Sequence, residues 1–484
     1  MARSDALKPF YFIVSFWGKE FRKHFLRLSA ASLLAPGNIP SLSNPVYSRL
    51  IICTTKDDWS AIQDDPLFCH LASHIQPVFF ELRRPAPEFL KPILREKQSR
   101  DKITASDDNN PESNIWITPD DIFPTNIYRD LEHIGNEIGH KLTIHHHYAL
   151  RILFMNAGHK AGACQAFEEK ANAVFLGPDL MMADGAVIEL ERLVNEGHKV
   201  VLTATLRFAQ DECLTVFQNA GHMVAGQPLT LSPRQLVEMV FKHMHPETAC
   251  FEFDSPYFCD TATSSLWKIP GDDGILLHNL NFYPLLVNYE DLTVHHADYF
   301  DAGGTIDGQY IARHFDPNKH ITVVTDSDRL MLASFTRSTE YYYPLTTGWR
   351  KTHPWVRERY KTYLIRKTLY SSMGDIVKRH FYTLPIRFHS KPFTPVWDEI
   401  QQRAATVARN AVSSMNVWDS ILGFTLPKFR FAWIRQPQTD RRPPLVFYGK
   451  QLCTCVWDLS ARLSTKFPQH IQQKLKRFAK KCGE

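Results

Sequence analysis

The sequence lacks an apolar run long enough to cross a membrane and a pair of cysteines spaced to bind zinc. The apolar run at residues 10–17 is far shorter than the roughly 20 residues of a membrane helix, and no apolar core of a signal peptide follows Met1. Nine cysteines are scattered along the chain, with Cys453 and Cys455 as the only close pair. This pattern is typical of reduced thiols and not of a disulfide framework or a zinc knuckle. We therefore expect a cytoplasmic protein, with peripheral attachment to the inner membrane as a further location.

Several motifs of nucleotide-binding and hydrolytic proteins are also missing. The sequence contains no Gly-x-Gly-x-x-Gly and no Gly-Lys-Ser/Thr, which disfavours dinucleotide and P-loop sites. It has no Gly-x-Ser-x-Gly, which disfavours a hydrolase with a nucleophile elbow. Nothing matches a DNA- or RNA-binding signature, so we expect no nucleic acid among the partners.

What the sequence does contain predicts a folded α/β protein. Of its 484 residues, 44% are hydrophobic and 12% aromatic, which is typical of globular proteins with two or three domains. Strands are expected at residues 10–17, 48–55, 77–82, 173–176, 200–206 and 321–325, and those at 10–17 and 173–176 are expected to be buried. Helices are expected at residues 19–34, 57–63, 127–170 with a break near Gly158, 186–196 and 232–242. This alternation predicts a doubly wound, mostly parallel sheet.

The character of the chain changes near residue 336, where we place a domain boundary. Residues 1–335 form the predicted α/β domain, and residues 336–484 form a mainly helical, basic-aromatic region. Residues 350–391 hold 11 Lys and Arg against two acids, although the whole chain has a net charge of only +5. Cations mixed with aromatics suit a phosphate-rich partner or a membrane surface, and a solvated helix face over a buried aromatic stripe is the alternative.

The first candidate site follows the expected strand at residues 173–176. That strand ends at Gly177-Pro178-Asp179, and Asp184 follows. Ligands of open α/β sheets bind beyond the carboxyl ends of such strands. A carboxylate there can bind a metal ion or a sugar hydroxyl, whereas a helix cap or an Asx-turn is the structural alternative.

Two further segments carry acids close to an expected strand end or helix start. Asp326 and Asp328 come directly after the strand at residues 321–325 and form a natural clamp for Mn²⁺ or Mg²⁺, although a helix cap explains them equally well. Asp307 lies in the glycine-rich loop 303–308, whose backbone amides could approach a phosphate. A simple turn is the favoured interpretation of this loop.

Histidine clusters provide another set of candidate ligands. The chain has 22 histidines, among them the groups 145–147, 243–245 and 295–296. In an extended chain His243 and His245 share one face, as metal ligands do. A helix end, where histidine favours the last carbonyls, is the alternative. We include His245 among the candidate metal ligands.

The chain loosely resembles bacterial glycosyltransferases of the GT-A type over residues 8–335. Residues 10–18 and 173–179 are similar to the opening strand and the donor-site strand of that fold. Segments similar to bacterial proteins of glycan assembly are residues 16–18, 32–40, 305–307 and 324–328. The usual Asp-x-Asp of the family is absent at the donor strand, where Gly177-Pro178-Asp179 stands instead. This departure leaves room for a donor bound chiefly by Arg and Lys side chains.

The resemblance implies transfer of a sugar from a nucleotide sugar to a glycan or a lipid-linked acceptor. The residues expected to bind the donor are Gly177, Asp179 and Asp184. The residues expected to hold a divalent metal, Mn²⁺ or Mg²⁺, are Asp179, Asp328 and His245. The candidates for a general base are Asp307, Asp326 and Asp328. Two alternatives stay open: a non-catalytic glycan- or nucleotide-binding protein of an assembly complex, and a metal-dependent hydrolase that uses the His and Asp clusters.

Overall fold

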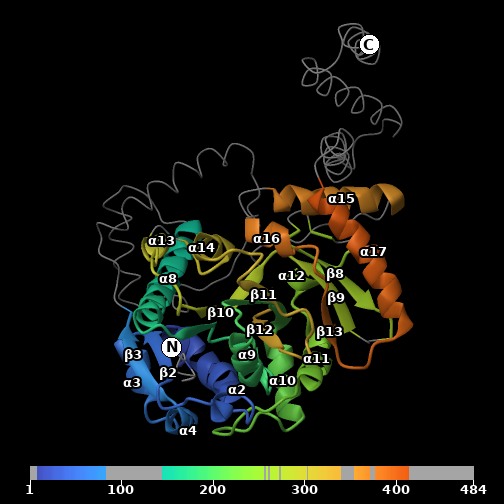
Figure 1. Cartoon of the computed structure of the whole chain (residues 1–484). Coiled ribbons are helices and arrows are strands. Elements are labelled where there is room, and N and C mark those ends of the chain that lie inside the picture. Colours follow the sequence, from blue (N-terminus) through green and yellow to red (C-terminus); the bar gives the residue numbers. More distant parts are fainter. Residues whose placement is uncertain are drawn as a thin grey trace, which may run out of the picture.

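A seven-stranded sheet lies at the centre of the protein (Figure 1). The computed structural model describes residues 8–82, 144–255, 258–259, 262–271, 274–301, 304–338, 354–370 and 376–413. In sheet order the strands are β11 (Ile321–Val323), β6 (Val200–Ala204), β10 (Phe282–Asn288), β4 (Asn172–Leu176), β1 (Phe10–Ser15), β2 (Arg49–Thr54) and β3 (Gln76–Glu81). Every pair is parallel except the two that β10 makes with β4 and β6. The protein is therefore a mixed α/β protein with a largely parallel sheet, as predicted at that level.

β1, β4 and β6 form where the sequence predicts them because they are apolar on both faces. All residues of β1, β4 and β6 are buried, as expected for strands of a parallel sheet that is covered on both sides. One prediction is corrected at residues 200–206: β6 ends at Ala204, and a new strand, β7 (Leu206–Ala209), pairs in a different sheet. The expected strand at residues 321–325 is shorter and ends at Val323.

A long helix, α8 (Ile144–Glu168), packs against β1, β2 and β4. The predicted break near Gly158 is wrong, because the helix runs through this position. Gly158 lies against Ser15 and Cys53, and Gly162 lies against Ile13. The glycines therefore allow close contact between helix and sheet, which outweighs their weak helix propensity.

Shorter helices surround the sheet. Those of the first half are α1 (Gly18–His24), a π-helix (Phe25–Ala30), α2 (Ala31–Leu33), a 3-10 turn (Ile39–Ser41), α3 (Lys56–Ile62), α4 (Pro66–His74), α9 (Ala186–Asn195) and α10 (Gln210–Asn219). Those that follow are α11 (Pro233–Val240), a 3-10 turn (Phe241–His243), α12 (Pro246–Ala249), α13 (Asp298–Asp301), α14 (Gly308–His314), α15 (Pro354–Leu369), α16 (Ile376–Phe381) and α17 (Pro395–Val412). The helices expected at residues 19–34, 57–63, 186–196 and 232–242 are confirmed, the first with a π-helical middle.

Two three-stranded sheets complete the described structure. One contains β5 (Leu180–Met182), β12 (Leu332–Thr336) and β7, and the other contains β13 (Ile386–His389), β9 (Gly274–Asn279) and β8 (Ser264–Ile269). Helices α15 and α17 pack together beside β8 and β9 (Figure 1). Their shared core includes Trp267, Tyr360 and Trp397. Residues on both sides of position 336 thus share one core, and the predicted domain boundary stays a prediction.

Two cations of the basic-aromatic region have structural roles. Lys361 is buried and donates to the Ser255 carbonyl at 2.7 Å. Arg366 is also buried, and its Nε donates to the Ala411 carbonyl at 3.2 Å. The basic count of this region therefore overstates the charge that is open to a partner. Cys453 and Cys455 lie outside the described residues.

Among the described helices, none has the length and apolar character that a membrane crossing requires.

Candidate functional site

The order of strands changes direction between β1 and β4. β2 and β3 lie on one side of β1, whereas β4 lies on its other side. Ligands of open α/β sheets bind beyond the carboxyl ends of the strands at such a switch point. The segments that follow these two ends are residues 16–18 and residues 177–179. Asp179 therefore lies at the strand end where the sequence places it.

The Asp179 carboxylate is half-buried among polar side chains from other strands. Ser334 Oγ of β12 donates to Asp179 Oδ2 at 3.5 Å. A Cβ atom on Gly177 would lie 2.6 Å from Asp179 Oδ1. The absence of a side chain at Gly177 therefore leaves room for the Asp179 carboxylate. Burial raises the pKa of Tyr283 in β10, and the charge of Asp179 raises it further. The position of the Asp179 carboxylate at this edge of the sheet thus depends on glycine at position 177.

An imidazole that the sequence did not single out lies within electrostatic range of Asp179, and a guanidinium lies within electrostatic range of that imidazole. His24 of α1 is buried, and its Nε2 lies 3.2 Å from Glu20 Oε1. Burial lowers the pKa of His24 more than the charges of Asp179 and Glu20 raise it, so the ring is neutral at pH 7. Arg337, directly after β12, pairs with Glu20 at 3.4 Å. The switch point thus combines a carboxylate, a neutral imidazole and a cation.

Two other predicted acids have contacts that stabilise local structure. Asp184 Oδ1 accepts a hydrogen bond from the Gly37 amide at 2.6 Å. Asp307 caps α14, accepting from the Gln309 amide at 3.1 Å and from Thr305 Oγ1 at 2.7 Å. Asp307 is therefore a capping residue in this structure, and residue 303 of the predicted glycine-rich loop lies outside the described residues. Substrate binding by Asp184 and base catalysis by Asp307 stay predictions.

The predicted metal set of Asp179, Asp328 and His245 is not brought together. His245 is fully buried at the start of α12, where its Nδ1 accepts from the Glu247 amide at 3.2 Å. Its Nε2 lies 3.0 Å from the Arg337 carbonyl, so both ring nitrogens have protein partners. His245 is therefore a capping residue in this structure. The side chains of His145–His147, at the start of α8, are not among those described.

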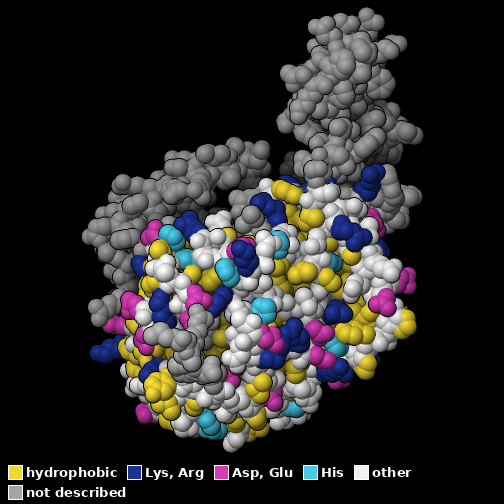
Figure 2. All heavy atoms as spheres, viewed as in Figure 1, with side chains coloured by type: hydrophobic (Ala, Val, Ile, Leu, Met, Phe, Trp, Pro, Cys, Tyr) yellow, Lys and Arg dark blue, Asp and Glu magenta, His cyan; other side chains and the backbone are white. Residues whose placement is uncertain are grey.

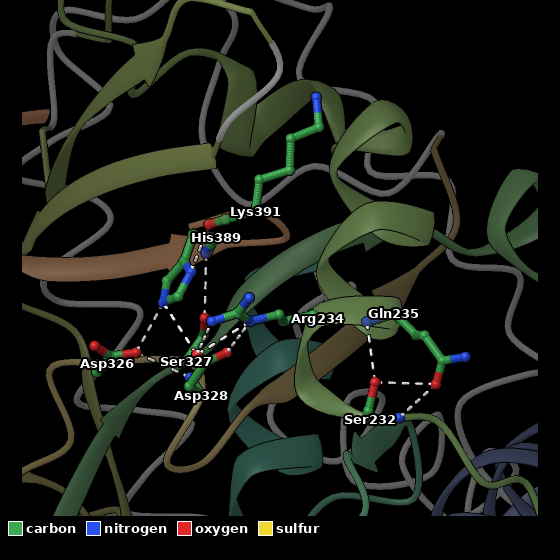
Figure 3. Close-up of polar contacts among 8 residues, drawn as sticks. All are labelled: Ser232, Arg234, Gln235, Asp326, Ser327, Asp328, His389 and Lys391. Atoms are coloured by element: carbon green, nitrogen blue, oxygen red, sulfur yellow. Dashed lines mark hydrogen bonds and ion pairs between the residues drawn. The ribbon is translucent and has the colours of Figure 1, made fainter. Parts of the chain in front are cut away.

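Asp328 lies instead with Asp326 and His389 (Figure 3). One ligand atom from each of these three residues lies within 4.8 Å of the other two, and among the described residues they form the one such group of metal-ligating side chains. His389 ends β13, and its Nε2 is 3.0 Å from Asp326 Oδ1 and 3.7 Å from Asp328 Oδ2. We name these three residues the Asp-Asp-His cluster. The predicted pair of carboxylates is thus present, and it has a histidine partner that sequence reasoning missed.

The charges in the Asp-Asp-His cluster stabilise one another. The hydrogen bond from His389 lowers the pKa of Asp326 below its usual value, despite partial burial. Burial lowers the pKa of His389, but its hydrogen bonds to Asp326 and the Lys391 carbonyl and the nearby acids outweigh this effect and raise it. The Asp326 carboxylate is therefore ionised at neutral pH.

Side chains from two helices fix the turn that carries Asp326 and Asp328. α11 begins with a capping box between Ser232 and Gln235, which places Arg234 in its first turn. Arg234 donates to both oxygens of Asp328, with Nη2 2.7 Å from Oδ2. Arg329 donates from Nε to Glu189 of α9 at 2.8 Å. Figure 2 shows acidic and basic side chains beside one another over this part of the molecule.

The Glu189 carboxylate should make the stability of this turn sensitive to acid. Burial raises its pKa, but hydrogen bonds and charge from Arg192 and Arg329 outweigh burial and hold the pKa below the usual 4.5. Because the pKa is lower in the folded state, the stabilisation is present above pH 4.5 and is lost as pH falls through the folded-state value. We expect Glu189→Gln to lower Tm at pH 7. Near pH 3 the Tm of the variant should approach that of the wild type. Tm measured from pH 7 to pH 3 for both proteins tests this, and parallel curves would contradict it.

A scan against protein-family models and a search of curated proteins found no match to this sequence. A functional assignment therefore depends on the residues and their geometry.

Proposed function

We propose that the protein is a glycosyltransferase that moves a sugar from a nucleotide-sugar donor to a hydroxyl of a glycan or lipid-linked acceptor. The observation that supports this most is the position of Asp179 at the switch point between β1 and β4. In this proposal the central sheet is the nucleotide-binding layer of a GT-A-like fold, and the carboxyl ends of its strands bind the donor.

The side chains at this edge suit the parts of a nucleotide sugar. The Asp179 carboxylate can accept hydrogen bonds from a ribose or sugar hydroxyl, beside the Gly177 backbone. Arg337, whose side chain is 42% exposed, can pair with the diphosphate through its planar guanidinium. Neutralising that diphosphate stabilises the charge that develops on the leaving group. Asp184 supports this edge through the Gly37 amide.

The reaction needs a path for one proton. The acceptor oxygen bonds to the anomeric carbon as the bond from that carbon to the diphosphate breaks, and the nucleoside diphosphate leaves with the electron pair. A base then takes the acceptor proton. Asp307, Asp326 and Asp328 stay the candidates for this base, and each of the three carboxylates also has a protein partner: Asp307 caps α14, Asp326 pairs with His389 and Asp328 pairs with Arg234.

The resemblance also implies a divalent ion, which would act as a Lewis acid on the diphosphate when bound. Among the described residues, the Asp-Asp-His cluster has the donor atoms that suit such an ion, and Asp179 is not part of it.

We expect Asp179→Asn to lower turnover of a nucleotide sugar by about 100-fold or more, since it removes the charge that faces the donor. The nucleotide class of the donor is identified first, by measuring Tm with UDP, GDP and CMP sugars, each in the presence of either EDTA or Mn²⁺. A ligand that binds only the folded state raises Tm. The matched control is Asp64→Asn, on an exposed turn between α3 and α4. Both variants should keep Tm within a few degrees of the wild type. Unchanged turnover in Asp179→Asn would remove the basis of the proposal.

The Asp-Asp-His cluster gives a specific reason to keep a metal-dependent hydrolase as the second candidate. In that case Asp326→Asn would abolish turnover while Asp179→Asn would not. A protein that binds nucleotide sugars with no turnover would indicate the non-catalytic binding function.

A further inference from the structure

The three side chains of the Asp-Asp-His cluster come from segments 63 positions apart and converge on one point. Atoms that share one metal ion at about 2.0–2.2 Å lie within about 4.4 Å of one another. The distances from His389 Nε2 to Asp326 Oδ1 and Asp328 Oδ2, 3.0 and 3.7 Å, both satisfy this limit. The two distances from His389 therefore fit a single ion.

The other ring nitrogen of His389 is held in the way that a metal ligand requires. Nδ1 lies 3.0 Å from the Lys391 carbonyl, which can only accept, so Nδ1 carries a proton. Nε2 is then the ring nitrogen that faces Asp326 and Asp328; it donates to Asp326 when it carries a proton, and it offers its lone pair to an ion that replaces that proton. Metal-binding histidines typically donate their second N–H to a carbonyl or carboxylate, which fixes the ring and its tautomer.

The histidine is also almost closed to water, whereas the acids are partly open. The side chain of His389 is 2% exposed, against 22% for Asp326 and 36% for Asp328. Two carboxylates that lie close together attract a cation. The arrangement offers three ligands on the protein side and leaves solvent or a substrate oxygen access from the acid side.

We propose that Asp326, Asp328 and His389 bind one divalent cation of the Mn²⁺ or Zn²⁺ type. One imidazole with two carboxylates suits these ions, whereas Ca²⁺ takes six to eight oxygens and Mg²⁺ keeps most of its water. The inference concerns binding alone and does not depend on the proposed sugar transfer.

Arg234 is the internal competitor for this ion. Its guanidinium contacts both oxygens of Asp328, including the Oδ2 that faces His389. An ion at the cluster must share Asp328 with this cation or displace it. Removing Arg234 should therefore tighten ion binding, whereas removing a ligand should weaken it.

The test is a titration of the EDTA-treated, full-length protein with MnCl₂, with free Mn²⁺ followed by EPR and ZnCl₂ measured as a competitor. We expect one ion per chain. Asp326→Asn and His389→Gln should each lower the affinity by at least the roughly 10- to 100-fold that loss of an outer-shell partner costs. Arg234→Gln should raise the affinity, and Asp64→Asn should leave it unchanged.

The opposite signs distinguish a ligand effect from poor folding, because a misfolded variant cannot bind more tightly than the wild type. Circular dichroism and Tm of each variant provide a second check. Absence of stoichiometric Mn²⁺ or Zn²⁺ binding by the folded wild type would overturn the proposal, as would equal affinity in Asp326→Asn and the wild type. If the ion binds but Asp179→Asn keeps full turnover, the metal site stands and the proposed function fails.

Discussion

Gly158→Val should lower the free energy of unfolding by about 1–3 kcal/mol or more, the usual effect of overpacking a core. A Cβ atom at this position would lie 2.0 Å from Ser15 Oγ and 2.8 Å from Cys53 Cβ. Ser15 and Cys53 belong to the neighbouring strands β1 and β2, which are buried and so cannot move away without disturbing the core. The helix must therefore lift from the sheet or the strands must move. Urea unfolding followed by circular dichroism measures the effect.

Ala157→Val is the matched control on the same helix. Ala157 is exposed, so the added methyl groups meet solvent. The control loses only the helix propensity of valine relative to alanine, at most about 0.7 kcal/mol. If the two variants are equally stable, α8 does not pack on β1 and β2 as closely as the structure has it.

Gly158 also shows why the sequence pattern gave a wrong prediction for this helix. A glycine within a helical pattern normally weakens the helix, so a break near residue 158 was a reasonable expectation. The contact that overrides this propensity is with residues 15 and 53, more than 100 positions away. No local pattern records such a contact. The strands, by contrast, could be predicted because burial on both faces leaves continuous apolar runs bounded by turns.

The order of the strands could not be predicted from the same runs. β10 inserts antiparallel between β4 and β6, although it follows both in the chain. The sequence analysis predicts no strand at β10, and a buried apolar run does not specify a strand's direction. Only tertiary packing decides where it pairs.

The acids of the candidate site were predictable, and their partners were not. Asp179, Asp326 and Asp328 follow recognisable strands, so their place at a carboxyl end could be inferred. His389 is one of 22 histidines, and it reaches Asp326 through β13, a strand that the basic-aromatic composition obscured. The choice of His245 as a metal ligand stays a prediction, and a pattern of two nearby histidines does not reveal that one of them caps a helix.

Gly274→Ala should have the second large effect, because it changes both stability and the Asp-Asp-His cluster. Gly274 starts β9 with φ of +140°, and it pairs with His389 in β13. A Cβ atom there would lie 2.1 Å from the Phe388 carbonyl oxygen and 3.0 Å from His389 Cα. These are backbone atoms, so the strand itself must move. We expect a loss of about 3 kcal/mol or more, from overpacking together with backbone strain.

The displacement of β13 should carry His389 away from Asp326. In the full-length protein, Gly274→Ala should therefore weaken Mn²⁺ binding as well as lower stability, although the substituted residue offers no ligand. The control is Gly221→Ala, where φ is +74° but no atom lies within 4 Å of the added Cβ. That variant loses only about 1–2 kcal/mol, from its left-handed backbone, and should bind Mn²⁺ like the wild type. Wild-type Mn²⁺ affinity in a folded Gly274→Ala protein would show that the position of His389 does not depend on the close approach of β9 and β13.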